Sequence, residues 1–227
     1  MLAPHGMSNA RHIPLDPFIT NLDYLRDSKT YGFIFGSGTQ VFGCIPAVAV
    51  FARMRLDEGT HRHLCSAHSK QKYRTLRDRV EALRSNVLED VQYTDPAAAV
   101  ARDMYCGALR IFLETAMCGA IVDDHATLRV IQRYVDEYMV KDDIASATEW
   151  GTIAVWPLMI AGSCITSVEQ QKEFCYSLWN TPMWRVNQVW TAEKILKLIW
   201  MSKDRCMYGP YGLYLAMEKH GIDMPMA

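Results

Sequence analysis

The sequence predicts an all-α protein with about nine helices in an irregular antiparallel array around a buried central helix. Apolar residues recur at spacings of three and four along most of the 227 residues, as they do on one face of an amphipathic helix. Ser, Thr or Asp followed by Glu, Gln or Pro marks several helix starts. Residues 31–35 are the single stretch with the pattern of a strand.

The composition bounds the kind of protein. Half of the chain is hydrophobic, 22% is charged, and the net charge is −1. A chain of this length buries roughly 70% of its unfolded surface, so it needs no disulfide bonds or structural metal to be stable. The near-zero net charge argues against a protein that binds nucleic acid over its whole surface, since phosphate binding needs a positive balance. We expect residues 1–41 to be a loose segment with a short helix, and residues 42–227 to be a single helical domain.

The cysteines and the hydropathy pattern indicate in which cellular compartment the protein is expected. Seven cysteines lie at positions 44, 65, 106, 118, 164, 175 and 206, mostly inside apolar runs where cysteine acts as a small buried hydrophobe. Residues 1–18 lack the apolar segment of a signal peptide. Both observations favour a reducing intracellular compartment. The uncharged run 150–168 is interrupted by Gly, Ser and Thr, so we expect a buried helix there and no membrane span.

The helices expected in the first two thirds of the chain each have a start signal or an apolar face. Proline at 17 and at 46 opens the first two, since proline is tolerated in a first turn. The third has Leu76 and Val80 on its buried side, and we interpret its basic side as a solvated helix face rather than a phosphate-binding surface. These helices cover residues 18–26, 46–56, 69–88, 97–120 and 126–139.

Residues 146–204 are the stretch around which the other helices are arranged. Ser146 opens a capping box ahead of residues 153–161, which are apolar on all sides and therefore expected to be buried. Pro157 lacks an amide hydrogen and crowds the carbonyl four residues earlier, so we expect a kink there. Gly162 then ends the helix, at a position suited to a positive φ angle.

Two further helices complete this stretch, and a short one follows it. A capping box within residues 166–170 opens the first, which is expected to end at Asn180. Its buried face is expected to hold Val168, Phe174, Cys175 and Leu178. A Thr-Pro pair at residue 181 starts the next helix, which runs to Trp200 with an apolar stripe. The last helix, residues 211–220, is expected to stop at the glycine that follows it.

His61, His63, Cys65 and His68 form the one metal-like cluster of the sequence, because zinc takes these ligand types. Residues 61, 63 and 65 would fan around a helix, so they suit a metal only on a strand or loop, and a helix starts close by. We therefore expect exposed histidines at a helix entry rather than zinc. No metal, cofactor or catalytic residue is assigned in this chain.

Two other patterns suggest chemistry but have simpler interpretations. The Gly-Ser-Gly stretch 36–38 could cradle a phosphate, but neither the following Lys-Ser or Lys-Thr nor the strand and helix of such a loop is evident. Asp123, Asp124 and His125 carry acid and base groups, but adjacent side chains point in different directions. Capping of the next helix by one of the two aspartates explains them better.

The heptapeptide WPLMIAG at residues 156–162 resembles the WPLFIAG signature of the fungal-specific transcription factor domain, the helical regulatory region of fungal zinc-cluster regulators. In that family a short polar helix follows the signature, and then comes a helix that ends in Trp and charged residues. Residues 169–174 and 198–204 fit this order. Further matches begin at residue 42, so the resemblance extends from there to the C-terminus.

The resemblance implies a nuclear regulator of RNA polymerase II genes, whose helical domain senses an effector or binds coregulator proteins. The family also has a zinc-cluster DNA-binding module, which needs paired C-x2-C-x6-C cysteines. This chain contains no C-x2-C spacing, and no cysteine precedes Cys44. We therefore expect zinc only in a cysteine cluster outside this sequence, and DNA contact only through such a module or a DNA-binding partner. A dimer is compatible with the pattern.

Two alternatives to a transcription regulator stay open. One is a helical interaction or scaffold protein without DNA contact. The other is a small-molecule enzyme on a helical bundle, which we do not expect, since the sequence has no metalloprotease, nucleophile-elbow or dinucleotide motif. If the domain has a ligand or partner pocket, we place it at Pro157 and at three tryptophans expected to face it, Trp156, Trp190 and Trp200.

Overall fold

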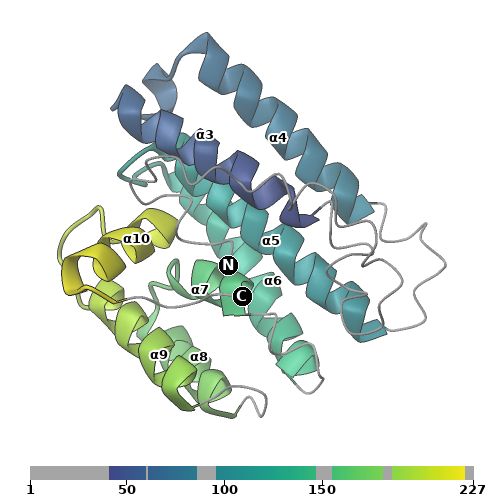
Figure 1. Ribbon diagram of the computed structural model, residues 1–227, viewed down its shortest axis with the longest axis vertical. Coiled ribbons are helices and arrows are strands. Elements are labelled where there is room, and N and C mark those ends of the chain that lie inside the picture. The colour runs from purple at the N-terminus through teal and green to yellow at the C-terminus, as the bar shows by residue number, and fades with distance from the viewer. Residues whose placement is uncertain (1–40, 60, 86–95, 147–154, 181–185, 223–227) are drawn as a thin grey trace.

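The computed structural model describes residues 41–59, 61–85, 96–146, 155–180 and 186–222. Within these ranges it contains eight α-helices, one short 3-10 helix and no strand, which confirms the all-α prediction (Figure 1). In chain order the elements are α3 (Cys44–Glu58), η4 (Arg62–Leu64), α4 (Ala67–Ser85), α5 (Pro96–Cys118), α6 (His125–Ser146), α7 (Val155–Gly162), α8 (Val168–Asn180), α9 (Val186–Trp200) and α10 (Gly209–His220).

Two helices form the middle of the fold. All eight residues of α7 are buried, as expected for a helix without a polar face. The much longer α5 packs against α3, α4, α6, α7 and α10. Figure 1 shows α3 and α4 on one side of α5, with α8, α9 and α10 grouped on the other side of the molecule. The core is therefore continuous from the first described helix to the last.

Local start and stop signals act as the sequence predicted. Asp124 caps α6, because its carboxylate accepts hydrogen bonds from the backbone N–H of Thr127 at 3.0 Å and of Ala126 at 3.4 Å. Ser167 caps α8 by accepting from the backbone N–H of Gln170 at 3.4 Å. Gly221 follows α10 with φ at 58°, in the left-handed region that favours glycine.

Three details of the organising stretch differ from expectation. Ser146 is the last residue of α6, and the other residues of the predicted capping box lie outside the described ranges. Gly162 is not among the glycines with positive φ. Glycine is needed at this position because there is no room for a side chain: a Cβ there would lie 2.8 Å from Cζ of Phe174. Val168 is 56% exposed rather than buried, since the inward face of α8 is formed by Phe174 and Leu178.

Several predictions fall on residues that the structure does not describe. They are the helix at 18–26, the strand candidate 31–35, the Gly-Ser-Gly stretch 36–38 and the helix start at 181. The kink at Pro157 also stays a prediction, because residues 147–154 lie outside the described ranges. Pro157 itself is the third residue of α7 as described, in the first turn, where a missing amide hydrogen costs little. The boundary between residues 41 and 42 likewise remains a prediction.

Candidate functional site

Trp156, the first residue of the predicted pocket, lies inside an aromatic cluster. It is 3% exposed, and its ring stacks on Tyr105 of α5 with centroids 5.7 Å apart and an interplanar angle of 10°. Phe112, two turns further along α5, lies against the same ring at 6.4 Å. The indole therefore anchors the start of α7 to α5, and the neighbouring Pro157 is buried beside it.

Trp200 and Trp190 lie in two other settings, although both belong to α9. Trp200 donates a 3.0 Å hydrogen bond from Nε1 to the carbonyl oxygen of Gly162, and its ring meets Phe174 edge-on at 6.4 Å. Trp190 is 65% exposed. The structure thus does not bring the three tryptophans together around Pro157. A ligand pocket at these residues stays a prediction.

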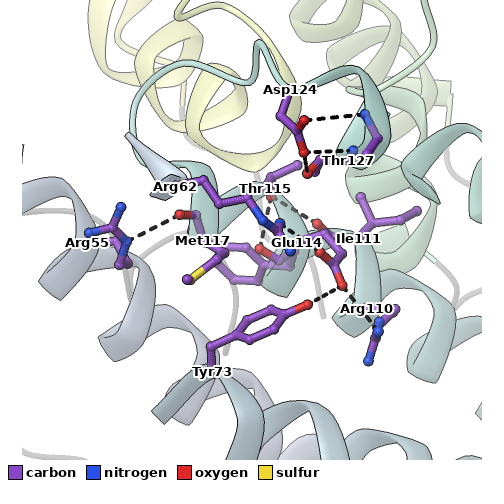
Figure 2. A network of polar contacts seen from close by, with 12 residues as sticks. Arg55, Arg62, Tyr73, Arg110, Ile111, Glu114, Thr115, Met117, Asp124 and Thr127 are labelled. Atoms are coloured by element: carbon purple, nitrogen blue, oxygen red, sulfur yellow. Dashed lines mark hydrogen bonds and ion pairs between the residues drawn. The ribbon is translucent and has the colours of Figure 1, made fainter. Parts of the chain in front are cut away.

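A buried carboxylate lies where η4, α4 and α5 meet (Figure 2). Glu114 of α5 is 3% exposed, and its Oε1 accepts a 2.5 Å hydrogen bond from the Tyr73 hydroxyl. Arg62 Nη1 donates to Oε2 at 3.0 Å, and Arg110 Nη2 lies 3.2 Å from Oε1. A buried charge needs such partners, because losing one typically costs about 3–5 kcal/mol. Glu114 therefore ties three elements together.

The Tyr73 side chain reflects this setting. It is 8% exposed, and burial together with the hydrogen bond to Glu114 raises its pKa to about 12. The guanidinium of Arg62 lies over its ring, 5.5 Å from the centroid. The phenol consequently stays neutral near pH 7 and acts as a hydrogen-bond donor to the carboxylate.

Arg55 is a fully buried arginine on α3. Its Nε donates a 3.2 Å hydrogen bond to the carbonyl of Met117, near the end of α5, where carbonyls have no partner within the helix. The same guanidinium pairs with Glu58 one turn further along α3. A positive charge at a helix C-terminus is favourable. Arg55 thus joins the end of α5 to α3.

Glu58 links Arg55 of α3 to α4. Its Oε1 accepts hydrogen bonds from the hydroxyls of Ser66 at 2.6 Å and Ser69 at 2.5 Å, and these bonds lower its pKa to about 2. Ser66 also caps α4, accepting from the backbone N–H of Ser69 at 3.1 Å. The connection between α3 and α4 is therefore closed by one carboxylate.

We call these two neighbouring groups of contacts, Arg55 with Glu58 and Arg62 with Tyr73 and Glu114, the polar clamp. Its carboxylates and guanidinium groups are each engaged by a partner from another turn or another helix. Such an arrangement holds the helices in register. Its carboxylates and guanidinium groups are occupied by one another rather than open to a substrate. The polar clamp is thus a structural device at the α3–α4–α5 junction.

Sequence reasoning did not find the polar clamp, although two signals were present. Arg55 falls in the buried register of α3, four residues after Phe51 and seven after Val48. Glu114 stands in the most apolar part of α5, next to Leu113. A charge in a buried register predicts a buried partner. The sequence does not say which residue that partner is.

The remaining chemical patterns are dispersed. His61, His63 and His68 are exposed, whereas Cys65 is 5% exposed. Within the described ranges no three His, Cys, Asp or Glu residues gather closely enough to hold a metal ion. Asp123 lies 3.9 Å from His61 and 3.8 Å from Arg205, on the surface.

Comparison with known proteins identifies the class. The family model described as "Fungal specific transcription factor domain" matches residues 6–224. The chain therefore belongs to this family, as the resemblance of its signature predicted, and the match includes most of the N-terminal segment that the resemblance left unplaced. No curated protein and no solved structure gives a significant match. Among the described helices, none is long and apolar enough to cross a membrane.

Membership of the family indicates a role in transcription regulation and a non-enzymatic protein. The signature residues 156–162 have a visible structural reason, since they form the buried helix α7 and end at the glycine that Phe174 and Trp200 both contact. What the family description leaves open is how this chain acts on genes.

Proposed function

We propose that this chain is a regulatory domain of the fungal zinc-cluster type, acting in the nucleus on genes transcribed by RNA polymerase II. The observation that carries the proposal is the family match over residues 6–224. The domain senses an effector or binds coregulator proteins, and the altered packing or contact changes transcription.

The proposal assigns DNA contact to another module. The chain has no C-x2-C spacing for a zinc cluster, and its net charge is −1. Sequence-specific DNA binding is driven largely by phosphate contacts from basic residues, which this balance does not favour. Zinc, where it takes part, belongs to a cysteine cluster outside this sequence or to a DNA-binding partner.

A tethering experiment tests this function. The chain is fused to an unrelated DNA-binding module and expressed in a fungal cell with a reporter gene downstream of that module's site. We expect reporter expression to change severalfold, up or down, relative to the module alone. A fusion that is folded and nuclear but leaves expression unchanged contradicts the proposal. Localisation of the untethered chain outside the nucleus contradicts it as well.

A second candidate is an interaction protein without any role at DNA, and one observation favours it. Three large aromatic side chains of α8 and α9 are exposed, Tyr176 at 73%, Trp179 at 43% and Trp190 at 65%. Aromatic residues are enriched where proteins bind partners. For such a protein, Trp190→Ala should weaken binding of the partner protein, and the tethered reporter should stay at the level of the module alone. Met201→Ala, 81% exposed and one residue beyond the end of α9, is the control.

A further inference from the structure

An open groove of about 470 Å³ lies between the first turns of α6 and the segments that precede α8 and α10. It is lined by His125, Leu128, Arg129, Gln132, Thr166 and Tyr208. Small-molecule sites typically have volumes of roughly 300–1,000 Å³. None of the six lining residues belongs to the polar clamp, and the family description assigns nothing to them.

The α6 side of the groove presents donors. His125 and Arg129 are four residues apart, so they lie one above the other on the same face of the helix. Both side chains are exposed, and neither has a hydrogen-bond or ion-pair partner within the part of the chain that the structure describes. Thr166, which also lines the groove, is exposed and has no such partner within the described residues either. These groups are available to a ligand.

The neighbouring carboxylates are engaged elsewhere. Asp124 accepts from the backbone N–H groups at the start of α6. Asp136 Oδ1 accepts from the side-chain amides of Gln132 and Gln170, each at 2.8 Å. Neither carboxylate lines the groove. The ionisable side chains among its six lining residues are therefore an arginine, a histidine and a tyrosine, and none is a carboxylate.

The rest of the groove wall is apolar. Leu128 and Tyr208 are half-buried. Burial, together with the neighbouring thiol of Cys164, raises the pKa of the Tyr208 hydroxyl, so the groove meets an uncharged phenol ring. The groove thus combines a donor cluster with a hydrocarbon surface, as small-molecule sites commonly do.

We propose that this groove binds a small organic acid, whose carboxylate is held by Arg129 and His125 and whose apolar body lies against Leu128 and Tyr208. Arginine suits this task because its planar fork can bind both carboxylate oxygens at once. The claim that the bound acid is a transcriptional effector rests on the proposed function. The claim that the groove binds an organic acid depends only on the residues that line it.

Backbone amide NMR of the ¹⁵N-labelled chain tests the site with sodium benzoate as the probe. Benzamide supplies the same ring without charge, and inorganic phosphate supplies charge without the ring. We expect benzoate at millimolar concentration to shift amides at residues 125–132, 166 and 208. Benzamide and phosphate are each expected to bind about tenfold more weakly or worse, because each lacks half of the recognition.

Two variants on α6 locate the carboxylate. Arg129→Gln is expected to raise the benzoate dissociation constant about tenfold or more. Arg133→Gln removes an arginine one turn further along, which lies 5.4 Å from the Tyr134 ring centroid and does not line the groove. It should leave the constant within about twofold. Both variants change exposed side chains, so circular dichroism should match the parent.

Four results would overturn the proposal: no benzoate shifts at the groove, equal binding of benzamide, equal binding of phosphate, or an unchanged constant in Arg129→Gln. The tethered reporter separates this inference from the proposed function. If benzoate binds but the reporter is inert, the binding site is supported and the transcriptional role is rejected. If the reporter responds but benzoate does not bind, the transcriptional role is supported and the binding site is rejected.

Discussion

The indole N–H of Trp200, the last residue of α9, donates a 3.0 Å hydrogen bond to the carbonyl oxygen of Gly162, the last residue of α7. A carbonyl at a helix C-terminus has no partner within its own helix, and this one lies in a buried segment. The oxygen also accepts a 3.2 Å hydrogen bond from the backbone N–H of Ile165. The indole bond adds a second donor and joins two helices whose ends are 38 residues apart in the sequence. Gly162, which ends the signature heptapeptide, and Trp200, which ends the third helix of the family-like pattern, thus meet in space.

Replacing Trp200 by Phe should measure this bond. The ring contact with Phe174 is largely retained, but the Gly162 carbonyl loses one of its two donors and keeps the backbone N–H of Ile165. We therefore expect the free energy of unfolding in urea to fall by about 1 kcal/mol. Trp190→Phe, on the same helix but 65% exposed, is the control and should stay within about 0.5 kcal/mol of the parent. Equal effects of both changes would show that the bond contributes nothing.

Gly162→Ala should destabilise the chain through crowding. The added Cβ would lie 2.8 Å from Cζ of Phe174 and 3.1 Å from Cδ1 of Leu196. Phe174 is fully buried, so its ring has little room to move, and we expect a loss of about 1–3 kcal/mol.

Gly107→Ala provides the matched comparison, because that glycine is also helical and its Cβ would meet nothing within 4 Å. There the substitution should be neutral or gain up to about 1 kcal/mol from helix propensity. Urea unfolding of both variants checks the contrast, and a neutral Gly162→Ala would mean that the end of α7 is loosely packed.

Glu114→Gln should weaken the polar clamp. The amide can still accept from Tyr73, but Arg62 and Arg110 lose the charge that balances them, so we expect a loss of about 3 kcal/mol. Glu137→Gln removes a half-exposed partner of Arg84 and should cost less than about 1 kcal/mol. Thermal and urea unfolding should rank the two variants in this order, and similar losses would refute a special role for Glu114.

Glu58 should make stability depend on acid pH. Its pKa is lowered from 4.5 to about 2, so the folded state favours the ionised form. Its contribution is fully present above about pH 5 and is lost as the pH falls towards 2. The stability difference between the parent and Glu58→Gln should therefore shrink over that window. A difference between the two chains that stays constant from pH 5 to pH 2 would refute this role of Glu58.

The parts of this fold that sequence analysis could predict depend on near neighbours. The capping of α6 by Asp124 and of α8 by Ser167 involves residues at most three positions away. The polar clamp could not be predicted in this way, since Arg55 and Met117 are 62 positions apart, and Arg62 and Glu114 are 52 apart. Periodicity reports that a position is buried, but not which distant helix covers it.

The placement of the three tryptophans also could not be predicted from local sequence. Val189, Ala192, Leu196 and Ile199 form the buried stripe of α9, as the spacing predicted. Trp190 follows Val189 directly and is therefore turned away from that stripe, into solvent. Trp156 and Trp200 needed tertiary contacts with α5 and α8 for their placement, which no local pattern contains.

The central place of α5 bears on how the chain is made. Synthesis on the ribosome proceeds from the N-terminus, so α3 and α4 can pack on α5 soon after residue 118 has emerged. The part of α5 and α7 that α10 covers has no partner until residue 220 is synthesised. For the time needed to translate about a hundred residues, at roughly 5–20 residues per second, that apolar surface stays open to chaperones or to neighbouring nascent chains.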